Sequence, residues 1–352
     1  MLLHGFLMSQ TVWDPVAPRL ADTGRYEVFA PTMAGHNGGP YAGTWLLSSS
    51  VLADHVERQL DRLGWDSAHL VGNSLGGWVA FELERRGRAR SVTGIGAAGG
   101  WTRWSPVKFE VIGKFIGGMP LLLLARLLGQ RILQLPLSRR LATLPLSATP
   151  SGVSERQLSG VVEDAAHCPA YFQLLVKSLL QPGLLELAQT AVPVQLVLCE
   201  KDRVVPPSRF SRHFTDHLPP ETRITRLDGV GHVPMFEAPE RVTTVLTDFI
   251  DDCVARSQRQ QPPLVSQLPP QVLGDRVEEF LALLPLLVGA DQDGEVLGHL
   301  AALHGGDDDA FQGLRELDHL GVSSSLPRCA SPRVQAKIEA IGLVEVGLPA
   351  WY

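Results

Sequence analysis

The sequence of 352 residues is 45% hydrophobic and 19% charged, with a formal net charge of −6. The apolar fraction is ample for a buried core, and the length exceeds that of one average domain. Because basic residues are not in excess, the composition gives no case for a nucleic-acid partner.

Strand-like and helical stretches alternate along the chain. In order, the predicted elements are a strand at Tyr26–Ala30, a helix at Leu47–Leu63, a strand at Ala68–Val71, a helix at Gly77–Arg86 and a strand at Ser91–Gly96. Strands resume at residues 192–198 and 222–227, and a helix follows at Pro239–Val254. This alternation predicts an α/β fold with a mostly parallel sheet covered by helices on both faces.

Three further segments complete the predicted organisation. Residues 99–190 are rich in leucine and predict a helical insertion, in which one helix is expected to begin at Pro120 because proline is favoured in a first turn. Residues 256–270 carry four prolines, as an exposed linker does. Residues 271–352 predict a small acidic helical segment. The sheet would therefore be built from two stretches, 1–98 and 191–255.

The most informative motif is Gly72-Asn73-Ser74-Leu75-Gly76, a G-x-S-x-G sequence between a predicted strand and a predicted helix. Strand, tight turn and helix are the context in which this pentapeptide forms a nucleophile elbow. A serine at a helix N-terminus also lies near unpaired N–H groups that favour negative charge. Ser74 is therefore the candidate nucleophile for attack on a carbonyl.

A serine hydroxyl needs a base, and the base needs a group that orients it. Asp202 lies in the loop after the predicted strand at 192–198, and His232 lies in a glycine-containing loop farther along the chain. Serine, aspartate and histidine in this order are typical of α/β-hydrolases. Glu200 lies on the same loop as Asp202 and is the alternative acid.

With these motifs, together with His4-Gly5-Phe6 and Pro31–His36, residues 1–255 resemble the α/β-hydrolase-fold serine hydrolases. In that family two strands precede the one that leads into the His-Gly motif. Since only Met1–Leu3 come before it, we expect the native chain to begin upstream or the sheet to lack its first two strands. The C-terminal segment resembles no family.

The resemblance implies roles for individual residues. Ser74 would be the nucleophile, His232 the base and Asp202 the group that holds the ring in the right tautomer. The backbone N–H groups of Leu75 and Phe6 would form the oxyanion hole. The helical insertion would be a cap, and aromatic and apolar residues on it would line the substrate pocket: Trp101, Trp104, Phe109, Phe115 and Met119.

The implied reaction is acyl transfer to water, with a carboxylic ester of an apolar acid or alcohol as the leading substrate class. Thioester cleavage, carbon–carbon bond hydrolysis and cofactor-free perhydrolysis use the same triad and stay open. A serine at the elbow argues against haloalkane or epoxide cleavage, which in this family would call for aspartate there. A non-catalytic ligand-binding protein of the same shape is the alternative of another class.

No metal, cofactor or membrane span is expected. The apolar stretch Leu121–Leu135 is bounded by Pro120 and Pro136 and interrupted by charges, so it is too short and too polar to span. The N-terminus lacks the segments of a signal peptide, and isolated buried thiols fit a reducing cytoplasm. The cysteines show no paired metal-ligand spacing; they are Cys168, Cys199, Cys253 and Cys329.

Overall fold

The computed structural model describes residues 1–44, 47–184 and 186–260. The predicted helical segment 271–352 and most of the predicted linker lie outside the described residues. The linker's first residues belong instead to a helix, which continues through Gln260. The helix can extend this far because the first proline of the linker, which would stop a helix, is Pro262.

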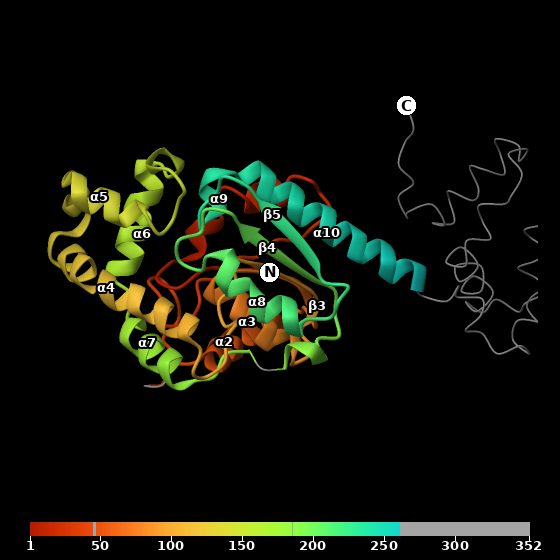
Figure 1. Ribbon diagram of the computed structural model, residues 1–352. Helices are drawn as coiled ribbons and strands as arrows, with labels where there is room; N and C mark the ends of the chain where they lie inside the picture. Colours follow the sequence, from red (N-terminus) through yellow and green to blue (C-terminus); the bar gives the residue numbers. More distant parts are fainter. Residues whose placement is uncertain (45–46, 185, 261–352) are drawn as a thin grey trace, which may run out of the picture. The chain divides into compact units, whose positions relative to one another are not determined.

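A parallel sheet lies at the centre of the fold (Figure 1). Within the described ranges it has five strands, hydrogen-bonded in the order β1-β2-β3-β4-β5. The predicted α/β architecture is confirmed. The strands are β1 (Leu2–Leu3), β2 (Ala68–Asn73), β3 (Ala89–Ile95), β4 (Val194–Cys199) and β5 (Arg223–Leu227).

Helices connect the strands and cover both faces of the sheet. Those of the core are α1 (Ala17–Ala21), α2 (Ser49–Arg62), α3 (Leu75–Glu84), α8 (Pro207–His217), α9 (Pro234–Glu237) and α10 (Pro239–Gln260), with a 3-10 turn η1 (Gln10–Trp13). Those of the insertion are α4 (Pro106–Leu128), α5 (Pro136–Thr143), α6 (Glu155–Ala166) and α7 (Tyr171–Leu180), with 3-10 turns η2 (Gly129–Gln134), η3 (Pro150–Gly152) and η4 (Leu187–Gln189).

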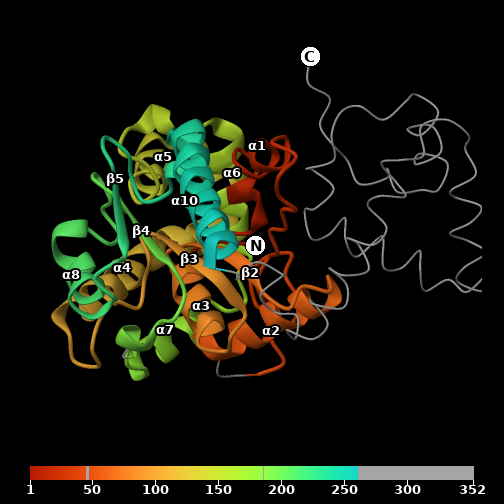
Figure 2. The same cartoon turned by 90° about the vertical axis from the view of Figure 1, so that its right-hand side faces the viewer.

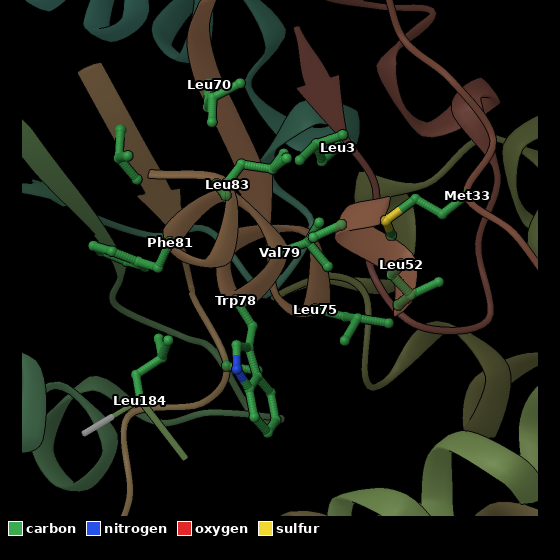
Figure 3. Close-up of a cluster of buried hydrophobic side chains, with 14 of the residues drawn as sticks. Leu3, Met33, Leu52, Leu70, Leu75, Trp78, Val79, Phe81, Leu83 and Leu184 are labelled. Atoms are coloured by element: carbon green, nitrogen blue, oxygen red, sulfur yellow. The ribbon is translucent and has the colours of Figure 1, made fainter. Parts of the chain in front are cut away.

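The alternation of side chains along each strand divides the core into two apolar layers. On β4, Leu196 and Leu198 pack into the layer that contains α2 and α3, whereas Val197 and Cys199 pack into the layer that contains α1 and α10. Figure 2 shows the sheet between α3 and α10. Figure 3 shows the first layer, with α3 side chains against the strands. Each buried leucine stabilises the fold by roughly 2 kcal/mol.

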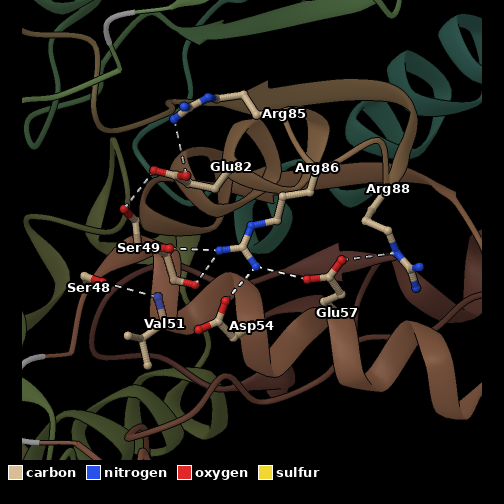
Figure 4. Close-up of polar contacts among 10 residues, drawn as sticks. Ser48, Ser49, Val51, Asp54, Glu57, Glu82, Arg85, Arg86 and Arg88 are labelled. Carbon is tan, nitrogen blue, oxygen red and sulfur yellow. Dashed lines mark hydrogen bonds and ion pairs between the residues drawn. The ribbon is translucent and has the colours of Figure 1, made fainter.

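One half-buried arginine fixes α2 against the end of α3 (Figure 4). Arg86 donates to Asp54 Oδ1 at 2.7 Å and to Glu57 Oε2 at 3.0 Å, both on α2. The same guanidinium binds the main-chain and hydroxyl oxygens of Ser50. Since α3 begins at the elbow, these contacts hold the helix that carries the candidate nucleophile.

The predicted strand Tyr26–Ala30 does not form a strand. Its one ladder-type contact is a hydrogen bond from the Leu2 N–H to Phe29 O at 2.8 Å. The reason is its neighbour, β1, which offers only two residues for pairing. The segment therefore lies beside the sheet without a repeating ladder.

Helix α4 is longer than predicted, because Pro120 lies inside it rather than at its start. The proline in a first-turn position is Pro106. Helix α4 and the 3-10 turn η2 together span the 29 residues Pro106–Gln134, the one helical stretch in the described part of the chain with the length and composition to cross a membrane. Its residues Val111, Ile112 and Leu122 are buried in the fold.

Candidate active site

The G-x-S-x-G motif forms a strained turn between β2 and α3. Ser74 has φ 53° and ψ −114°, a conformation that residues other than glycine rarely adopt. A Cβ on Gly72 would lie 2.2 Å from the Gly76 backbone, and one on Gly76 would lie 2.3 Å from Leu3 O. Both glycines are therefore required by close backbone approach, and Ser74 begins the helix as expected.

Asp202 and His232 form a buried pair. His232 Nδ1 and Asp202 Oδ2 are 2.6 Å apart, and the two side chains are 6% and 1% exposed. The other carboxylate oxygen, Oδ1, accepts from the N–H groups of Val204 and Val205, each at 2.8 Å. A carboxylate can only accept, so Nδ1 carries the proton and Nε2 is left as an acceptor.

The alternative acid, Glu200, takes no part in this pair. Its carboxylate accepts from Lys201 Nζ and from the Gly229 N–H, and it faces solvent. These two donors hold the pKa of Glu200 below its ordinary value. Glu200 therefore supports the histidine loop from outside, while Asp202 contacts the ring.

The residues around Ser74 bring the histidine loop to the elbow. The Asn73 amide donates to His232 O at 2.9 Å and to Ile95 O at 3.1 Å. Gly96 follows β3 with φ 49°, and a Cβ there would lie 2.9 Å from Asp202 Oδ2 and 3.2 Å from His232 Nδ1. The carboxyl ends of three strands thus meet at this point.

The Ser74 hydroxyl is not hydrogen-bonded to the ring, or to any other group among the residues described. In active sites of this type the contact between nucleophile and base often tightens only when substrate binds. The hydroxyl, the ring and the carboxylate all lie at the carboxyl edge of the sheet, where α/β folds place their ligand sites.

Glu237 is a second carboxylate behind the histidine loop. Its Oε2 accepts from the Gly231 N–H at 2.6 Å, and its Oε1 accepts from Ser147 Oγ at 2.8 Å and from the Ala148 N–H at 2.9 Å. It therefore joins the residue before His232 to the loop between α5 and α6. Three donors from two parts of the chain depend on this one side chain.

The two backbone N–H groups predicted for the oxyanion hole lie beside strained backbone. In the part of the chain that is described, neither the Leu75 nor the Phe6 N–H donates to another protein group. Leu7, next to Phe6, has φ 64°, and together with Ser74 it is one of the two described non-glycine residues with positive φ. Backbone strain of this kind concentrates at functional sites.

Two buried histidines support the loops around Phe6. His4 Nε2 accepts from the Met33 N–H at 2.8 Å, and its Nδ1 donates to Gly5 O. His36 Nδ1 donates to Ala34 O. Burial lowers the pKa of His4 well below its ordinary value and the pKa of His36 to about 4. Both rings are therefore neutral near pH 7 and hold backbone.

The predicted pocket residues lie in different surroundings. Trp101 is buried and its ring packs edge-on against Trp78 at 5.6 Å. Trp104 and Phe109 are 76% and 41% exposed, and Met119 is half-buried on α4. No contact recorded for the described residues joins these four to Ser74 or His232.

Another aromatic cluster contacts Phe6, whose N–H is a candidate donor of the oxyanion hole. The Phe6 ring stacks on Tyr171 of α7 at 5.8 Å and meets Phe115 of α4 edge-on at 4.9 Å. The Tyr171 hydroxyl donates to Phe115 O at 2.7 Å. The insertion therefore places an apolar surface against the loop that contains Phe6, as a cap would. Phe115 was among the predicted pocket residues, whereas Tyr171 was not.

Sequence reasoning did not identify Asn73, Gly96, Glu237 or Tyr171. Asn73 lies inside the elbow motif and Gly96 ends a predicted strand. The sequence therefore marks both positions but assigns no role to either. Glu237 and Tyr171 carry no local signal. Glu237 contacts Ser147 at a separation of 90 residues and Tyr171 contacts Phe115 at a separation of 56, and only the fold brings these residues together.

The sequence model of a family described as "Alpha/beta hydrolase family" matches residues 1–245. Epoxide hydrolase EphH of Mycobacterium tuberculosis is 75% identical over 207 residues, which are 59% of this chain and 97% of that protein. A pimeloyl-(acyl-carrier protein) methyl ester esterase of Edwardsiella ictaluri is 27% identical over 263 residues, 71% of this chain and 92% of that protein. A solved esterase of Thermogutta terrifontis superposes with a TM-score of 0.57 at 19% identity, covering 72% of this chain and 89% of that one, which is a likeness of fold.

Proposed function

The chain belongs to the alpha/beta hydrolase family, and from this premise we propose that it is a serine hydrolase that transfers an acyl group from a carboxylic ester to water. The observation that carries the proposal is the buried contact of 2.6 Å between His232 Nδ1 and Asp202 Oδ2. It lies at the edge of the sheet where Ser74 occupies its strained turn. A pair of this kind prepares a ring nitrogen to accept a proton from a nucleophile.

In the proposed reaction the Ser74 oxygen attacks the ester carbonyl while His232 Nε2 takes the hydroxyl proton. The tetrahedral oxyanion is bound by the N–H groups of Leu75 and Phe6, and one such donor is typically worth roughly 3–4 kcal/mol of barrier. The leaving alcohol then receives the proton from His232. Water activated by the same nitrogen hydrolyses the acyl-enzyme and restores Ser74.

Asp202 acts on the ring in this scheme and not on the substrate. Its Oδ2 fixes the proton on Nδ1, which leaves Nε2 as the base and stabilises the imidazolium that forms. The two N–H groups of Val204 and Val205 hold the carboxylate in place. The acid is therefore fixed beside a ring that becomes transiently positive.

The apolar surroundings support an ester with an apolar acyl or alcohol group. Phe6, Phe115 and Tyr171 form an aromatic surface beside the proposed oxyanion hole. The same triad also cleaves thioesters and carbon–carbon bonds and supports perhydrolysis, so the bond type is a matter for a substrate panel. A chain-length series of p-nitrophenyl esters, compared with matched thioesters, distinguishes ester hydrolysis from thioester hydrolysis.

Epoxide hydrolysis is the second candidate, because a relative with 75% identity carries that name. If Ser74 opened an epoxide, its Oγ would form a bond to carbon while the ring C–O bond breaks. The product is a serine ether with no carbonyl for water to attack, so the enzyme would stop after one turnover. Continued epoxide hydrolysis would instead need His232 to activate water directly, and Ser74→Ala would then keep the activity.

A fluorophosphonate probe tests the proposal with a defined site. We expect one label per chain at Ser74, lost in Ser74→Ala and retained in Ser151→Ala, a control at an exposed serine. Ester turnover should follow the label. A folded protein that is neither labelled nor active on esters would support a ligand-binding protein. Epoxide turnover that survives in Ser74→Ala would support the second candidate.

A further inference from the structure

Helix α4 presents a fully apolar face to solvent, here named the α4 stripe. Its members recur at spacings of 3 and 4 residues and so share one side of the helix; they are Phe109, Gly113, Ile116, Pro120, Leu123 and Leu127. All six are exposed, Leu127 by 80%. The outer face of a helix ordinarily carries polar residues, and a helix apolar on both sides is normally covered on both.

Two other helices of the cap also carry exposed apolar side chains. Of the 18 large hydrophobic side chains that are exposed in the described residues, 14 lie between Trp104 and Leu180. Such concentration marks an interaction site rather than ordinary scatter. The additional members at helical spacing are Leu137, Leu141 and Leu144 around α5, and Phe172, Val176, Leu179 and Leu180 on and near the end of α7.

Hydrogen bonds tie α4 to its neighbours in the cap and, through Lys114, to the core. The buried Lys108 Nζ donates to Leu179 O at 2.8 Å and Gln181 O at 2.6 Å. Lys114 Nζ donates to Val204 O, in the loop after β4 that contains Asp202. These bonds would break if α4 left the protein to cross a bilayer. The stripe is therefore available to a partner that contacts the surface of the folded protein.

Arg126 completes this set near the end of the helix, where its Nε donates to Ala166 O at 2.8 Å. Three cations on one side of α4 are thus committed to carbonyls of the fold. The opposite side keeps its apolar residues, and a Cβ at Gly113 or Gly117 would meet open space.

The segment of chain that contains the stripe has an excess of basic residues. Residues 101–144 contain seven Lys and Arg and one acidic residue, Glu110, although the whole chain is acidic. Arg103, Arg131 and Arg140 are exposed and make no ion pair within the described ranges. The Arg103 guanidinium lies over the exposed Trp104 ring at 5.7 Å. Tryptophan with basic residues is the composition found at membrane–water interfaces.

We propose that the α4 stripe docks on the surface of a lipid bilayer that contains anionic lipids. Apolar side chains enter the boundary between head groups and acyl chains, while Arg103, Arg131 and Arg140 meet lipid phosphates. Charge disfavours a second copy of the chain as the occupant. A two-fold interface would place the same basic surface against itself, which opposes association.

Vesicle co-sedimentation of the full chain tests the apolar part. We expect binding to vesicles of phosphatidylcholine with phosphatidylglycerol, weakened roughly ten-fold or more in Ile116→Gln/Leu123→Gln/Leu127→Gln. The matched control is Tyr41→Gln/Ile224→Gln/Val254→Gln, which changes three exposed apolar residues outside the cap and should bind as the parent does.

A charge series tests the lipid preference. Arg103→Gln/Arg131→Gln/Arg140→Gln should lose binding to anionic vesicles, whereas Arg62→Gln/Arg212→Gln/Arg226→Gln, at exposed positions in the core, should keep it. Absence of binding by the parent chain, or equal loss in both members of a pair, would overturn the proposal. The proposal would also be overturned if the parent chain binds no vesicles and the stripe substitutions change its oligomeric state.

Docking is read from sedimentation and does not depend on the proposed hydrolysis. Ser74→Ala, which should lose the fluorophosphonate label, should still bind anionic vesicles. Conversely, the stripe variants should keep turnover of a soluble short-chain ester, because their substituted side chains are exposed and lie outside the proposed catalytic machinery. Retained turnover also shows that these variants are folded.

Discussion

The Asn73 side-chain amide donates to the main-chain carbonyl of His232 at 2.9 Å, so the residue before the candidate nucleophile holds the residue that carries the candidate base. The two residues are 159 positions apart in the sequence. Through its second bond, to Ile95 O, the same amide also ties in the end of β3. The spacing of nucleophile and base is therefore set by a side chain that takes no part in the proposed proton transfer.

Asn73→Asp should impair both stability and turnover. A carboxylate cannot donate, so His232 O and Ile95 O would lose their partner and face an acceptor. Leaving buried groups unsatisfied costs roughly 1–3 kcal/mol, measurable as a lower free energy of unfolding in urea. The kcat for an ester should fall as well. Unchanged kcat in a folded variant would show that this bond does not position the base.

Asp202→Asn should keep the fold and lose the reaction. The amide can donate to Nδ1, which places the proton on Nε2 and leaves no base for Ser74, and a change of this type lowers kcat by about 10⁴-fold. Glu200→Gln is the control on the same loop, since Glu200 faces solvent and contacts Lys201 and Gly229 rather than the ring. Equal losses in the two variants would argue against Asp202 as the orienting acid.

The parts of the site that the sequence predicted are those that depend on short, local sequence patterns. The elbow needs glycines at fixed places around Ser74, and Asp202 and His232 follow strands whose apolar runs are easy to locate. Their convergence follows from a parallel sheet, because strand ends of the same sense meet at one edge. The choice between Glu200 and Asp202 did not follow, since both occupy the same loop.

The errors come from interactions that no local pattern encodes. Pro120 is favourable at a helix start, yet the packing of Val111 and Leu122 on either side of it carries α4 through the proline. The strand at Tyr26–Ala30 has suitable residues but lacks a long neighbour to pair with. In both cases tertiary context decided between local preferences that the sequence left balanced.

Gly96→Ala should disrupt the acid–base pair while leaving the fold largely intact. The new Cβ would lie 2.9 Å from Asp202 Oδ2 and 3.2 Å from His232 Nδ1, closer than a methyl group normally approaches. A displacement of about 1 Å can cost roughly 10²-fold in rate. Gly87→Ala is a matched control, because Gly87 has φ 73° but open space at the Cβ position. It should strain the backbone by a similar amount and leave kcat unchanged.

Glu237→Gln tests a positioning residue behind the base. The variant replaces one acceptor oxygen by an NH₂ group that would face the N–H of Gly231 or Ala148, so the histidine loop loses one anchor. We expect kcat to fall by roughly ten- to a hundred-fold with little change in KM. The low-pH limb of kcat/KM should also move, because His232 is held differently.

Glu240→Gln is the control for this change, since Glu240 is exposed and its side chain pairs with Arg19. It should leave the kinetics unaltered. If Glu237→Gln lowers thermal stability but leaves kcat and the pH profile of the surviving enzyme unchanged, Glu237 supports the fold and does not position His232.

His36 should make the stability of the protein depend on pH. Burial lowers its folded-state pKa to about 4 from an ordinary value of 6.5, so the unfolded chain binds a proton first as the pH falls. Its contribution is fully present above about pH 6.5 and is lost progressively down to about pH 4, reaching roughly 2 kcal/mol of loss at pH 5. Urea unfolding at pH 7.5 and pH 5 measures this difference.

The variant that isolates this effect is His36→Asn, which keeps an N–H donor for Ala34 O but cannot be protonated. The stability difference between pH 7.5 and pH 5 should shrink by roughly 2 kcal/mol, while the lowered pKa values of His4 and His69 keep part of the slope. His167→Asn, at an exposed position on the cap, should leave the difference as in the parent. If His36→Asn and the parent lose the same free energy on acidification, His36 is hydrated in solution and its burial does not oppose protonation.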